Sequence, residues 1–520
     1  MNPVYRWTRT SVGPASRAAP VIAVHGFAGR VRVRGGRPGP AIDWYRGLIT
    51  TLGVPEAMGN PPCDRDHRRW RVLARLPPGT VGGSDSVVGM PETGYPWPIE
   101  TTRLDNGLRV VVSEDRSVPV VAVNLWYDVG SRHEPEGQTG FAHLFEHLMF
   151  EGSVNVAKTE HMRLVQGAGG SLNATTNPDR TNYFETLPSE HLALALWLEA
   201  DRMGGLVPAL TQETLDNQRE VVKNERRQRY ENVPYGDAWL RLLPLLYPPG
   251  HPYHHATIGS MADLNAADLA TFQAFHTTYY APNNAVLTVA GDASASEVFA
   301  LADRYFGRLL PQPDIPPAPD GRVVPATGVP VRETVTGDVP APRIYLAHRT
   351  HPFGEPGYDV VTVLATVLGS GRGSRLYRRL ADGARLAQPD SVSAFGVDLA
   401  HGPAPLIITA TARDGVTVEQ LEAGLVEVVD GLADGVTEEE LDRAKALLTT
   451  AWWRQLATVD GRADILGRYA TQLGDPARAG ERLAGWLSVT AEQVAELARD
   501  LLGAADRVTL TYLPGDAEQA

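Results

Sequence analysis

The sequence predicts an α+β protein of two related halves, each a mainly antiparallel sheet covered by helices. A succession of segments, strand, strand, helix, strand, strand, helix, begins near residue 107 and recurs more loosely from about residue 331. The stretch 310–320 is rich in proline, which is typical of a linker. We therefore expect a first domain at residues 98–309 and a degenerate copy of it at residues 321–515.

The elements of both halves follow from apolar alternation and from helix-start signals. We expect Ser189, which follows a proline, and Thr211 to cap helix N-termini. The expected strands are 108–113, 118–126, 167–176, 181–187, 284–290, 343–348, 392–398, 405–411 and 507–513. The expected helices lie within 141–150, 160–166, 189–203, 211–231, 262–280, 294–307, 356–368, 417–432, 437–456 and 489–502.

Composition bounds the class of protein. The 520 residues are 43% hydrophobic and 21% charged, an ordinary balance for a globular chain. The sequence contains no run of about 18 apolar residues, so we expect no membrane span. The single cysteine, Cys63, excludes an intrachain disulfide and a thiolate zinc cluster and is compatible with a reducing compartment. The net charge of −13 argues against nucleic acid as a partner.

Residues 1–89 differ from the rest of the chain, because they hold 13 Arg, no Lys and 5 acidic residues and lack sustained periodicity. An organelle transit peptide would be richer in serine and would contain an amphipathic helix. The fragment 21–27 is similar to the strand and His-Gly turn of an α/β-hydrolase, but no Gly-x-Ser-x-Gly elbow follows it. We favour a third interpretation, in which the biological chain begins at Met90.

One stretch carries the chemistry of the chain, Phe141-Ala-His-Leu-Phe-Glu-His-Leu-Met-Phe150. On a helix, His143 and His147 lie one turn apart on one face, with Glu146 beside them. Two neutral imidazoles can bind one zinc ion, and the carboxylate can accept a proton from the water that completes the coordination. This is the inverted zinc-protease order, His-x-x-Glu-His. The alternative is an ordinary amphipathic helix, but two buried histidines and a glutamate need a partner to offset their desolvation.

The second half lacks these side chains at the matching positions. When residues 136–137 are aligned with residues 356–357, the two histidines and the glutamate fall on Val363, Val367 and Thr366. The second half therefore reads as a copy without metal ligands. The other histidines, among them His254 and His255, lie in loops or at helix starts, and we assign none of them as a ligand.

Four motifs in order, His143-Leu-Phe-Glu-His147, Gly170-Ser-Leu-Asn-Ala174, Asn182-Tyr183 and Gln218-Arg-Glu-Val-Val-Lys-Asn-Glu225, resemble the pitrilysin or insulinase-type zinc metallopeptidases. The resemblance covers roughly residues 98–515. The length from Met90 is similar to the branch of the mitochondrial processing peptidase beta subunit and its bacterial relatives. We therefore expect a cytoplasmic bacterial protein.

The resemblance implies the remaining site residues. It implies one zinc ion per chain, held by His143, His147 and Glu225, with Glu146 as the general base. Glu220 is the competing position for the third ligand, and five residues on a helix separate the two glutamates by about 140°, so both cannot face the metal. A family acid that lies beside the ligands falls here on Gln218. We therefore expect Gln218 and Glu220 to lie around the ligands.

The resemblance also implies how a substrate binds. Asn173 and Ala174, on the glycine-led strand, match substrate-holding positions, and a peptide would add to that edge as an extra strand. The expected function is a zinc endopeptidase acting on peptides or unfolded segments. The alternatives are a non-catalytic structural subunit of a larger complex and a zinc hydrolase of a non-peptide substrate.

A partner chain is expected as well. Two-domain members of this branch form a chamber from two chains, in which an Arg and a Tyr from a second-half domain reach the substrate. These positions fall here on Ala381 and Gln388, which cannot do that work. We therefore expect a heterodimer with a related, metal-free subunit that supplies the Arg and the Tyr.

Overall fold

The computed structural model describes residues 94–515, apart from residues 318, 323 and 325–327. The predictions for residues 1–89 and for a start at Met90 lie outside the described residues and stay predictions. The described residues belong to one compact unit. Within them, no helix combines the length and the apolar character needed to cross a membrane.

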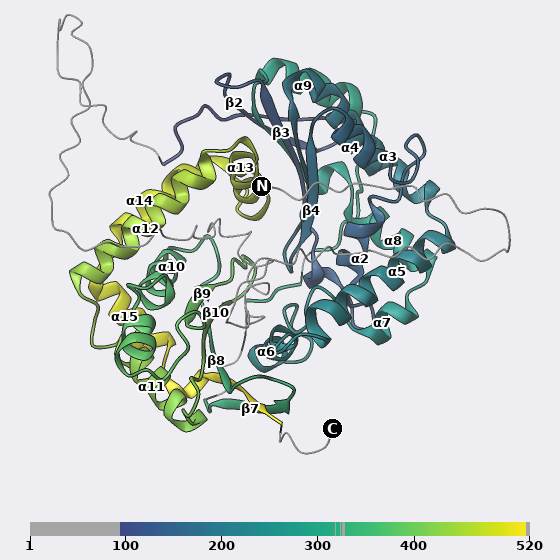
Figure 1. Cartoon of the computed structure of the whole chain (residues 1–520). Helices are drawn as coiled ribbons and strands as arrows, with labels where there is room; N and C mark the ends of the chain where they lie inside the picture. The colour runs from purple at the N-terminus through teal and green to yellow at the C-terminus, as the bar shows by residue number, and fades with distance from the viewer. Residues whose placement is uncertain (1–93, 318, 323, 325–327, 516–520) are drawn as a thin grey trace, which may run out of the picture. The chain divides into compact units, whose positions relative to one another are not determined.

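The first half forms a six-stranded sheet in the order β1-β2-β6-β3-β5-β4 (Figure 1). Neighbouring strands pair antiparallel except β2 and β6, which are parallel. Among the described residues, strand β4 lies at the edge of the sheet, and one side of its backbone has no strand beside it. The strands are β1 (Glu100–Arg103), β2 (Arg109–Glu114), β3 (Val120–Tyr127), β4 (Ser171–Thr176), β5 (Thr181–Pro188) and β6 (Ala285–Gly291).

Helices of the first half cover this sheet, and α3, α4 and α9 contact its strands directly (Figure 1). The helices are α2 (Phe141–Leu148), α3 (Glu160–Gly167), α4 (Leu192–Ala209), α5 (Gln212–Arg226), α6 (Ala238–Leu246), α7 (Met261–Ala266), α8 (Leu269–Tyr279) and α9 (Ala295–Phe306). A π-helical turn, Arg227–Glu231, continues α5.

The second half forms a five-stranded sheet in the order β7-β11-β8-β10-β9, in which β7 and β11 are parallel and the other pairs antiparallel. The strands are β7 (Val331–Gly337), β8 (Arg343–Thr350), β9 (Ser393–Gly396), β10 (Ala404–Thr411) and β11 (Val508–Pro514). The helices are α10 (Pro356–Gly369), α11 (Val418–Asp430), α12 (Glu438–Leu456), α13 (Val459–Gln472), α14 (Arg482–Ser488) and α15 (Ala491–Leu501). The predicted fold class, two mainly antiparallel sheets covered by helices, is confirmed.

The two halves exchange one helix each. Helix α13, from the second half, packs on β3 and β6 of the first sheet, while α6, from the first half, packs on β8 and β11 of the second sheet. A Cβ atom at Gly467 would lie 2.5 Å from the Trp126 indole nitrogen, so glycine is what lets α13 approach β3 this closely. Arg109 donates across the same interface to the Ala470 carbonyl at 2.6 Å. The division into domains at 98–309 and 321–515 stays a prediction.

Two predicted helices differ from the structure. The single helix expected at 262–280 is wrong, because the chain breaks between α7 and α8. Asp268 starts α8 there by accepting a hydrogen bond from the Thr271 N–H at 2.8 Å. The helix expected at 211–231 is regular only to Arg226 and then widens into the π turn. Strand β1 and helices α6, α13 and α14 were not predicted.

Candidate metal centre

Helix α2 carries both histidines, and its start is fixed by residues from two other segments. Gly140 precedes it with φ of 95°, and a Cβ atom there would lie 3.0 Å from the Gly259 Cα. The buried Glu134 carboxylate accepts hydrogen bonds from the N–H groups of Gly140 and Ala142, each at 2.8 Å, and contacts His255 Nε2 at 2.9 Å. The first turn of the helix is therefore held by a carboxylate rather than by its own N-cap side chain.

The apolar face of α2 anchors it in the core. Phe141 stacks on Phe272 with ring centroids 4.2 Å apart, and Phe145 stacks on Phe275 at 5.6 Å. The opposite face presents His143 and His147 towards α5, which packs against α2. The sequence pattern that alternates aromatic and titratable residues thus separates them onto two faces of the helix.

The structure brings His143, His147 and Glu225 together, with one potential ligand atom of each lying within 4.8 Å of the others. Glu225 Oε2 lies 3.2 Å from His147 Nε2 and 3.7 Å from His143 Nε2. Two imidazole nitrogens and one carboxylate oxygen this close together form a donor set that zinc prefers. The three side chains fit a zinc ion.

The protonation of this group also suits a metal. Burial lowers the pKa of His143, and the neighbouring Glu146 and Glu225 carboxylates offset only part of that effect. Burial alone would raise the pKa of Glu225, but the hydrogen bond with His147 and the charges of His143 and Arg229 outweigh it and lower the pKa to about 2. Burial opposes a charge on His147 too, yet its contact with Glu225 raises the pKa, so a proton and a metal would compete for that nitrogen.

Glu146 and Arg229 complete the surroundings of the three residues. Glu146 points from α2 towards β4, where its Oε2 accepts a hydrogen bond from the Thr176 hydroxyl at 2.6 Å. Arg229 Nη1 lies 2.7 Å from Glu225 Oε1, the oxygen that does not face the histidines. Arg229 was not singled out in the sequence, although its position four residues after Glu225 is the spacing of a helical ion pair.

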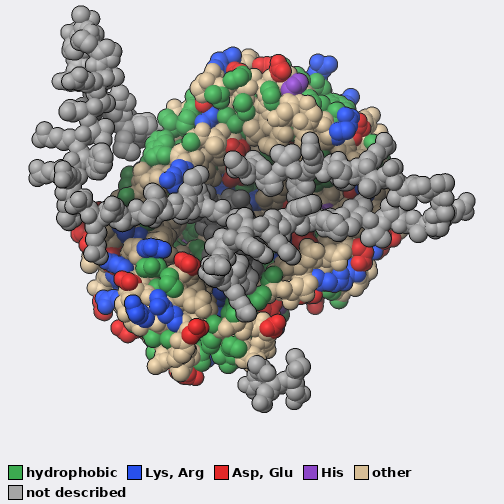
Figure 2. Space-filling model, viewed as in Figure 1, with side chains coloured by type: hydrophobic (Ala, Val, Ile, Leu, Met, Phe, Trp, Pro, Cys, Tyr) green, Lys and Arg blue, Asp and Glu red, His purple; other side chains and the backbone are tan. Residues whose placement is uncertain are grey.

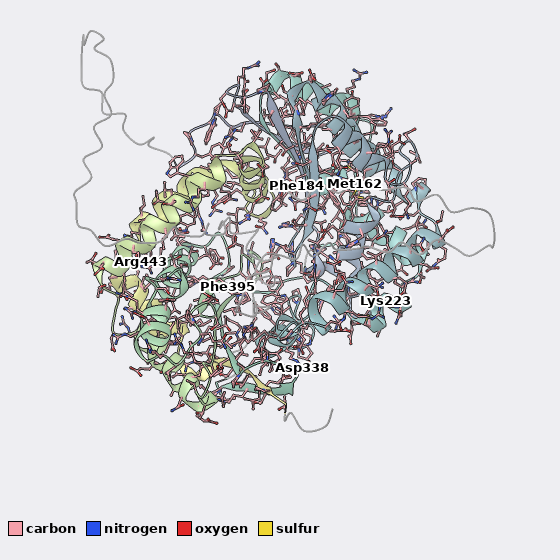
Figure 3. All side chains as sticks on the ribbon, in the orientation of Figure 1. Met162, Phe184, Lys223, Asp338, Phe395 and Arg443 are labelled. Carbon is pink, nitrogen blue, oxygen red and sulfur yellow. The ribbon has the colours of Figure 1, made fainter. Side chains whose placement is uncertain are left out.

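Of the two residues expected around the ligands, one lies near the centre and the other does not. Gln218 lies near the centre and donates from Nε2 to Glu151 Oε1 at 2.7 Å, and Glu151 also forms an ion pair with Lys158. Glu220 does not reach the centre. Its side chain is 59% exposed and pairs with Lys223, labelled in Figure 3, at 2.7 Å, because the helix turns it away from Glu225.

The two residues expected to hold substrate lie on the edge strand. Asn173 is exposed and Ala174 is buried, as the alternation of a strand requires, and they oppose Phe184 and Tyr183 of β5 (Figure 3). Strand β4 contacts α2, the helix that carries both histidines. The geometry is suited to an extended peptide, since the backbone of β4 can pair with one.

A second group of possible ligands, His161, Glu185 and Glu199, lies buried between β5 and helices α3 and α4. Arg202 is buried beside it, forms an ion pair with Glu199 and lies 4.2 Å from the Tyr183 ring centroid. Burial, followed by the charge of Glu199, raises the pKa of Glu185 well above its usual range, and burial lowers that of His161 to about 2. Because Arg202 already balances Glu199, and burial favours the neutral form of Glu185, we assign this group no metal ion.

The second half offers no similar group among its described residues. Val363 and Val367 are fully buried in α10, and the Thr366 hydroxyl donates to the Thr362 carbonyl.

Basic and acidic side chains are interspersed over the described part of the face seen in Figure 2.

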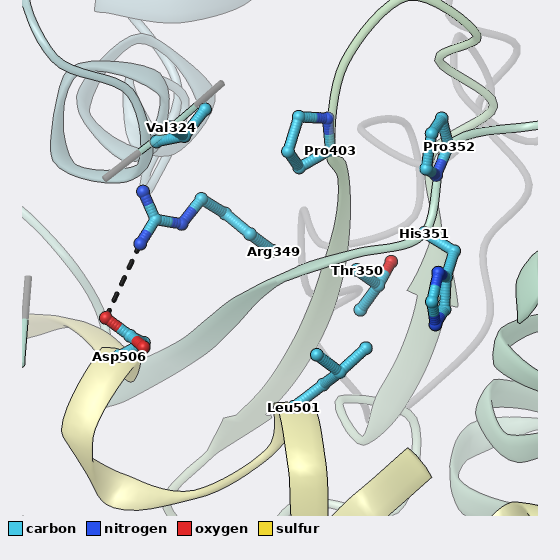
Figure 4. A pocket seen from close by; sticks show the side chains of 8 residues that line it. All are labelled: Val324, Arg349, Thr350, His351, Pro352, Pro403, Leu501 and Asp506. Carbon is cyan, nitrogen blue, oxygen red and sulfur yellow. Dashed lines mark hydrogen bonds and ion pairs between the residues drawn. The ribbon is translucent and has the colours of Figure 1, made fainter. Parts of the chain in front are cut away.

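A surface pocket lies in the second half at the end of β8 (Figure 4). Arg349 pairs with Asp506 at 3.5 Å on its wall, and Thr350 and His351 also line it. The Arg349 guanidinium already has the Asp506 carboxylate as its partner, so we assign the pocket no role.

Comparison with known proteins identifies the family. The model of the insulinase family (peptidase family M16) matches residues 109–237, and that of the peptidase M16 inactive domain matches residues 266–448. The chain is 31% identical to the zinc protease PqqE of Helicobacter pylori over 379 residues, which are 72% of this chain and 83% of that protein. It is 28% identical to the mitochondrial-processing peptidase subunit beta of Bos taurus over 408 residues, 74% of this chain and 76% of that protein.

The solved structures agree with the sequence comparison. The crystal structure of a protease from Helicobacter pylori matches with a TM-score of 0.76 at 28% sequence identity, covering 80% of this chain and all of that one. The family expected from the four motifs is confirmed, and the names of the relatives imply that zinc is used within it. This chain belongs to the insulinase family of peptidases, family M16.

Proposed function

We propose that this chain is a zinc endopeptidase that hydrolyses peptides or unfolded segments. The observation that carries the proposal is the convergence of His143, His147 and Glu225 beside Glu146. The names of the relatives support a peptidase, and the donor set supports zinc as its one metal per chain.

Each side chain of the centre would have a distinct role. His143, His147 and Glu225 would hold the ion, and Arg229 would fix the Glu225 carboxylate through its second oxygen. Zinc, when bound, supplies a Lewis acid that polarises the scissile carbonyl and acidifies a water molecule. Glu146 would take a proton from the attacking water and pass it to the leaving amine.

The open edge of β4 would orient the peptide. Main-chain pairing with Ser171–Thr176 would place an extended substrate beside α2, and Asn173 and Ala174 lie on that strand. Recognition of this kind reads the backbone more than the side chains, so the sequence preference would be loose. A non-peptide substrate could not use this edge.

The first prediction tests the base. We expect Glu146→Gln to keep its zinc and to lose activity by on the order of 10² to 10⁴-fold, because the ligands stay while the proton acceptor is removed. Zinc content by metal analysis and cleavage of a mixed peptide library would be measured on the same preparations. A variant that still cleaves at the wild-type rate would move the base to another residue and refute this mechanism.

We further propose that the chain is the catalytic member of a heterodimer with a related, metal-free subunit. A relative with 28% identity is named as a subunit of mitochondrial-processing peptidase. The position expected to hold the Arg is the buried Ala381. The position expected to hold the Tyr is Gln388, which donates to the Ala412 carbonyl at 2.9 Å. Neither position of this chain therefore offers the expected group to a substrate. Location in the cytoplasm stays a prediction.

A further inference from the structure

The Glu146 carboxylate is held by a residue from another element. The Thr176 hydroxyl donates a short hydrogen bond to Glu146 Oε2 at 2.6 Å. Thr176 is the last residue of β4, whereas Glu146 belongs to α2. The contact therefore links the residue proposed as the base to the strand proposed to bind the peptide.

The hairpin after β4 fixes the position of Thr176. Thr176 pairs with Thr181 of β5, and the Asn177 side-chain oxygen accepts hydrogen bonds from the N–H groups of Asp179 at 2.8 Å and Arg180 at 2.9 Å. Arg180, which is buried, donates to the Thr175 carbonyl at 2.8 Å. Both chain neighbours of Thr176 are thus bound within the hairpin, which leaves its backbone little freedom.

The hairpin is in turn anchored to the rest of the molecule. Asp179 is fully buried and accepts hydrogen bonds from the Tyr253 hydroxyl at 2.6 Å and from the Ala400 N–H at 2.7 Å. The carbonyl of Pro178 accepts the Arg132 N–H at 3.0 Å. A hydroxyl carried on so constrained a turn can act as a fixed reference point for a neighbouring side chain.

We propose that Thr176 is a positioning residue that holds Glu146 in the orientation needed to accept the proton of the attacking water. Binding Oε2 leaves Oε1 as the oxygen that takes the proton, so the hydroxyl selects both the rotamer and the reacting atom. A glutamate side chain has several rotamers, and proton transfer depends on its reaching the water at hydrogen-bond distance. The inference rests on the proposed function, because it assigns Glu146 the role of base.

The test compares Thr176→Val, which keeps the shape and removes the hydroxyl, with Thr176→Ser, which restores the hydroxyl. With a fluorogenic peptide, we expect Thr176→Val to lower kcat by about 10-fold or more, because a misplaced base transfers protons poorly. KM, zinc content and Tm should stay close to wild type. Thr176→Ser should recover most of kcat. Thr336 is an exposed threonine on β7, so Thr336→Val is the matched control and should behave as wild type.

A double variant separates positioning from a structural role. In a Glu146→Gln background, adding Thr176→Val should lower the residual rate no further, because the group that Thr176 orients is already absent. An active wild type whose Thr176→Val variant keeps its kcat, or loses zinc, would overturn this inference alone. A zinc-loaded wild type that cleaves no peptide, either alone or with a related metal-free subunit, would overturn the proposed function and this inference with it.

Discussion

Each of the three candidate ligands contributes a different physical property to the centre. His143 is largely enclosed, and desolvation lowers its pKa, whereas His147 and Glu225 are joined by a 3.2 Å contact. Arg229 occupies the Glu225 oxygen that faces away from the histidines. The carboxylate therefore has one oxygen committed to a cation and one directed at the two imidazoles, which is the arrangement a single metal requires.

The two glutamates of α5 give a sharp test at this scale. We expect Glu225→Gln to weaken zinc binding at least as much as the roughly 10- to 100-fold that loss of an outer contact costs, because it removes a charged ligand. Glu220→Gln should bind zinc as the wild type does, because that side chain is exposed and paired with Lys223. Zinc titration of both variants gives the comparison. Loss of zinc from Glu220→Gln alone would show that Glu220, and not Glu225, is the third ligand.

The sequence could predict only part of this centre. The four-residue spacing of His143 and His147 predicts a shared helix face, and the resemblance supplied Glu225. The contacts of Thr176 with Glu146 and of His255 with Glu134 could not be predicted, because they join residues 30 and 121 positions apart in sequence. Glu134 lies only six residues before Gly140, but its role at the start of α2 depends on how the chain folds back onto the helix. Gln218 was expected beside the ligands, and the structure adds Glu151 as the carboxylate that its amide contacts.

Helix α2 is short and depends on its neighbours for stability. It has eight residues, too few to be stable alone in water, and its N-cap residue is a glycine without a side chain. Glu134 bonds two N–H groups at its start, although burial raises the pKa of that carboxyl. The position of both histidines thus depends on one buried carboxylate outside the helix.

We therefore expect Glu134→Ala to destabilise the protein by about 1 to 3 kcal/mol, because two buried N–H groups lose their acceptor. The variant should also lose zinc faster to a chelator, since the first turn of α2 would loosen. Urea unfolding and chelator competition measure the two effects. Glu213→Ala, in the first turn of α5, is the control and should change neither much. Unchanged stability and zinc retention in Glu134→Ala would show that α2 is held by its apolar face alone.

Helices α6 and α13, which the sequence did not predict, each have a sequence feature that obscures the helical pattern. Helix α13 packs against the first sheet along β3 and β6 and contains Gly461 and Gly467, so its sequence lacks a clear polar stripe. Helix α6 contains Pro244, which obscures its helical pattern. These two helices are the ones that the halves exchange. Their partners lie hundreds of residues away, which local periodicity cannot register.

At the scale of the whole molecule, the exchange of α6 and α13 ties the two sheets together. Arg462 of α13 pairs with Asp115 of the first half at 2.8 Å, with an arginine side chain only 3% exposed. Helix α13 of the second half thus packs on the first sheet. Helix α10, which has no ligand side chains at the matching positions, is part of a hydrophobic core. Within one chain, the second half acts as a structural support more than as a second reaction site.

The resemblance implies that an Arg and a Tyr from a second-half domain reach the substrate, and this chain carries Ala381 and Gln388 at those positions. Arg378, a nearby arginine three residues before Ala381, pairs with Glu440 at 2.8 Å. Gln388 is held against β10 by its amide. A separate subunit that carries an Arg and a Tyr at these positions would complete one site per pair.

The last prediction follows from this arrangement. We expect the purified chain alone to bind one zinc ion and to cleave peptides slowly, and we expect a related metal-free protein, added in equal amount, to raise kcat by about 10²-fold or more, because missing oxyanion donors cost that much. Sizing of the mixture should show a one-to-one complex. The matched control is the same partner with its Arg and Tyr replaced by Ala and Gln, which should bind without activating. Full activity of the chain alone, unaffected by the partner, would refute the heterodimer and leave the candidate metal centre standing.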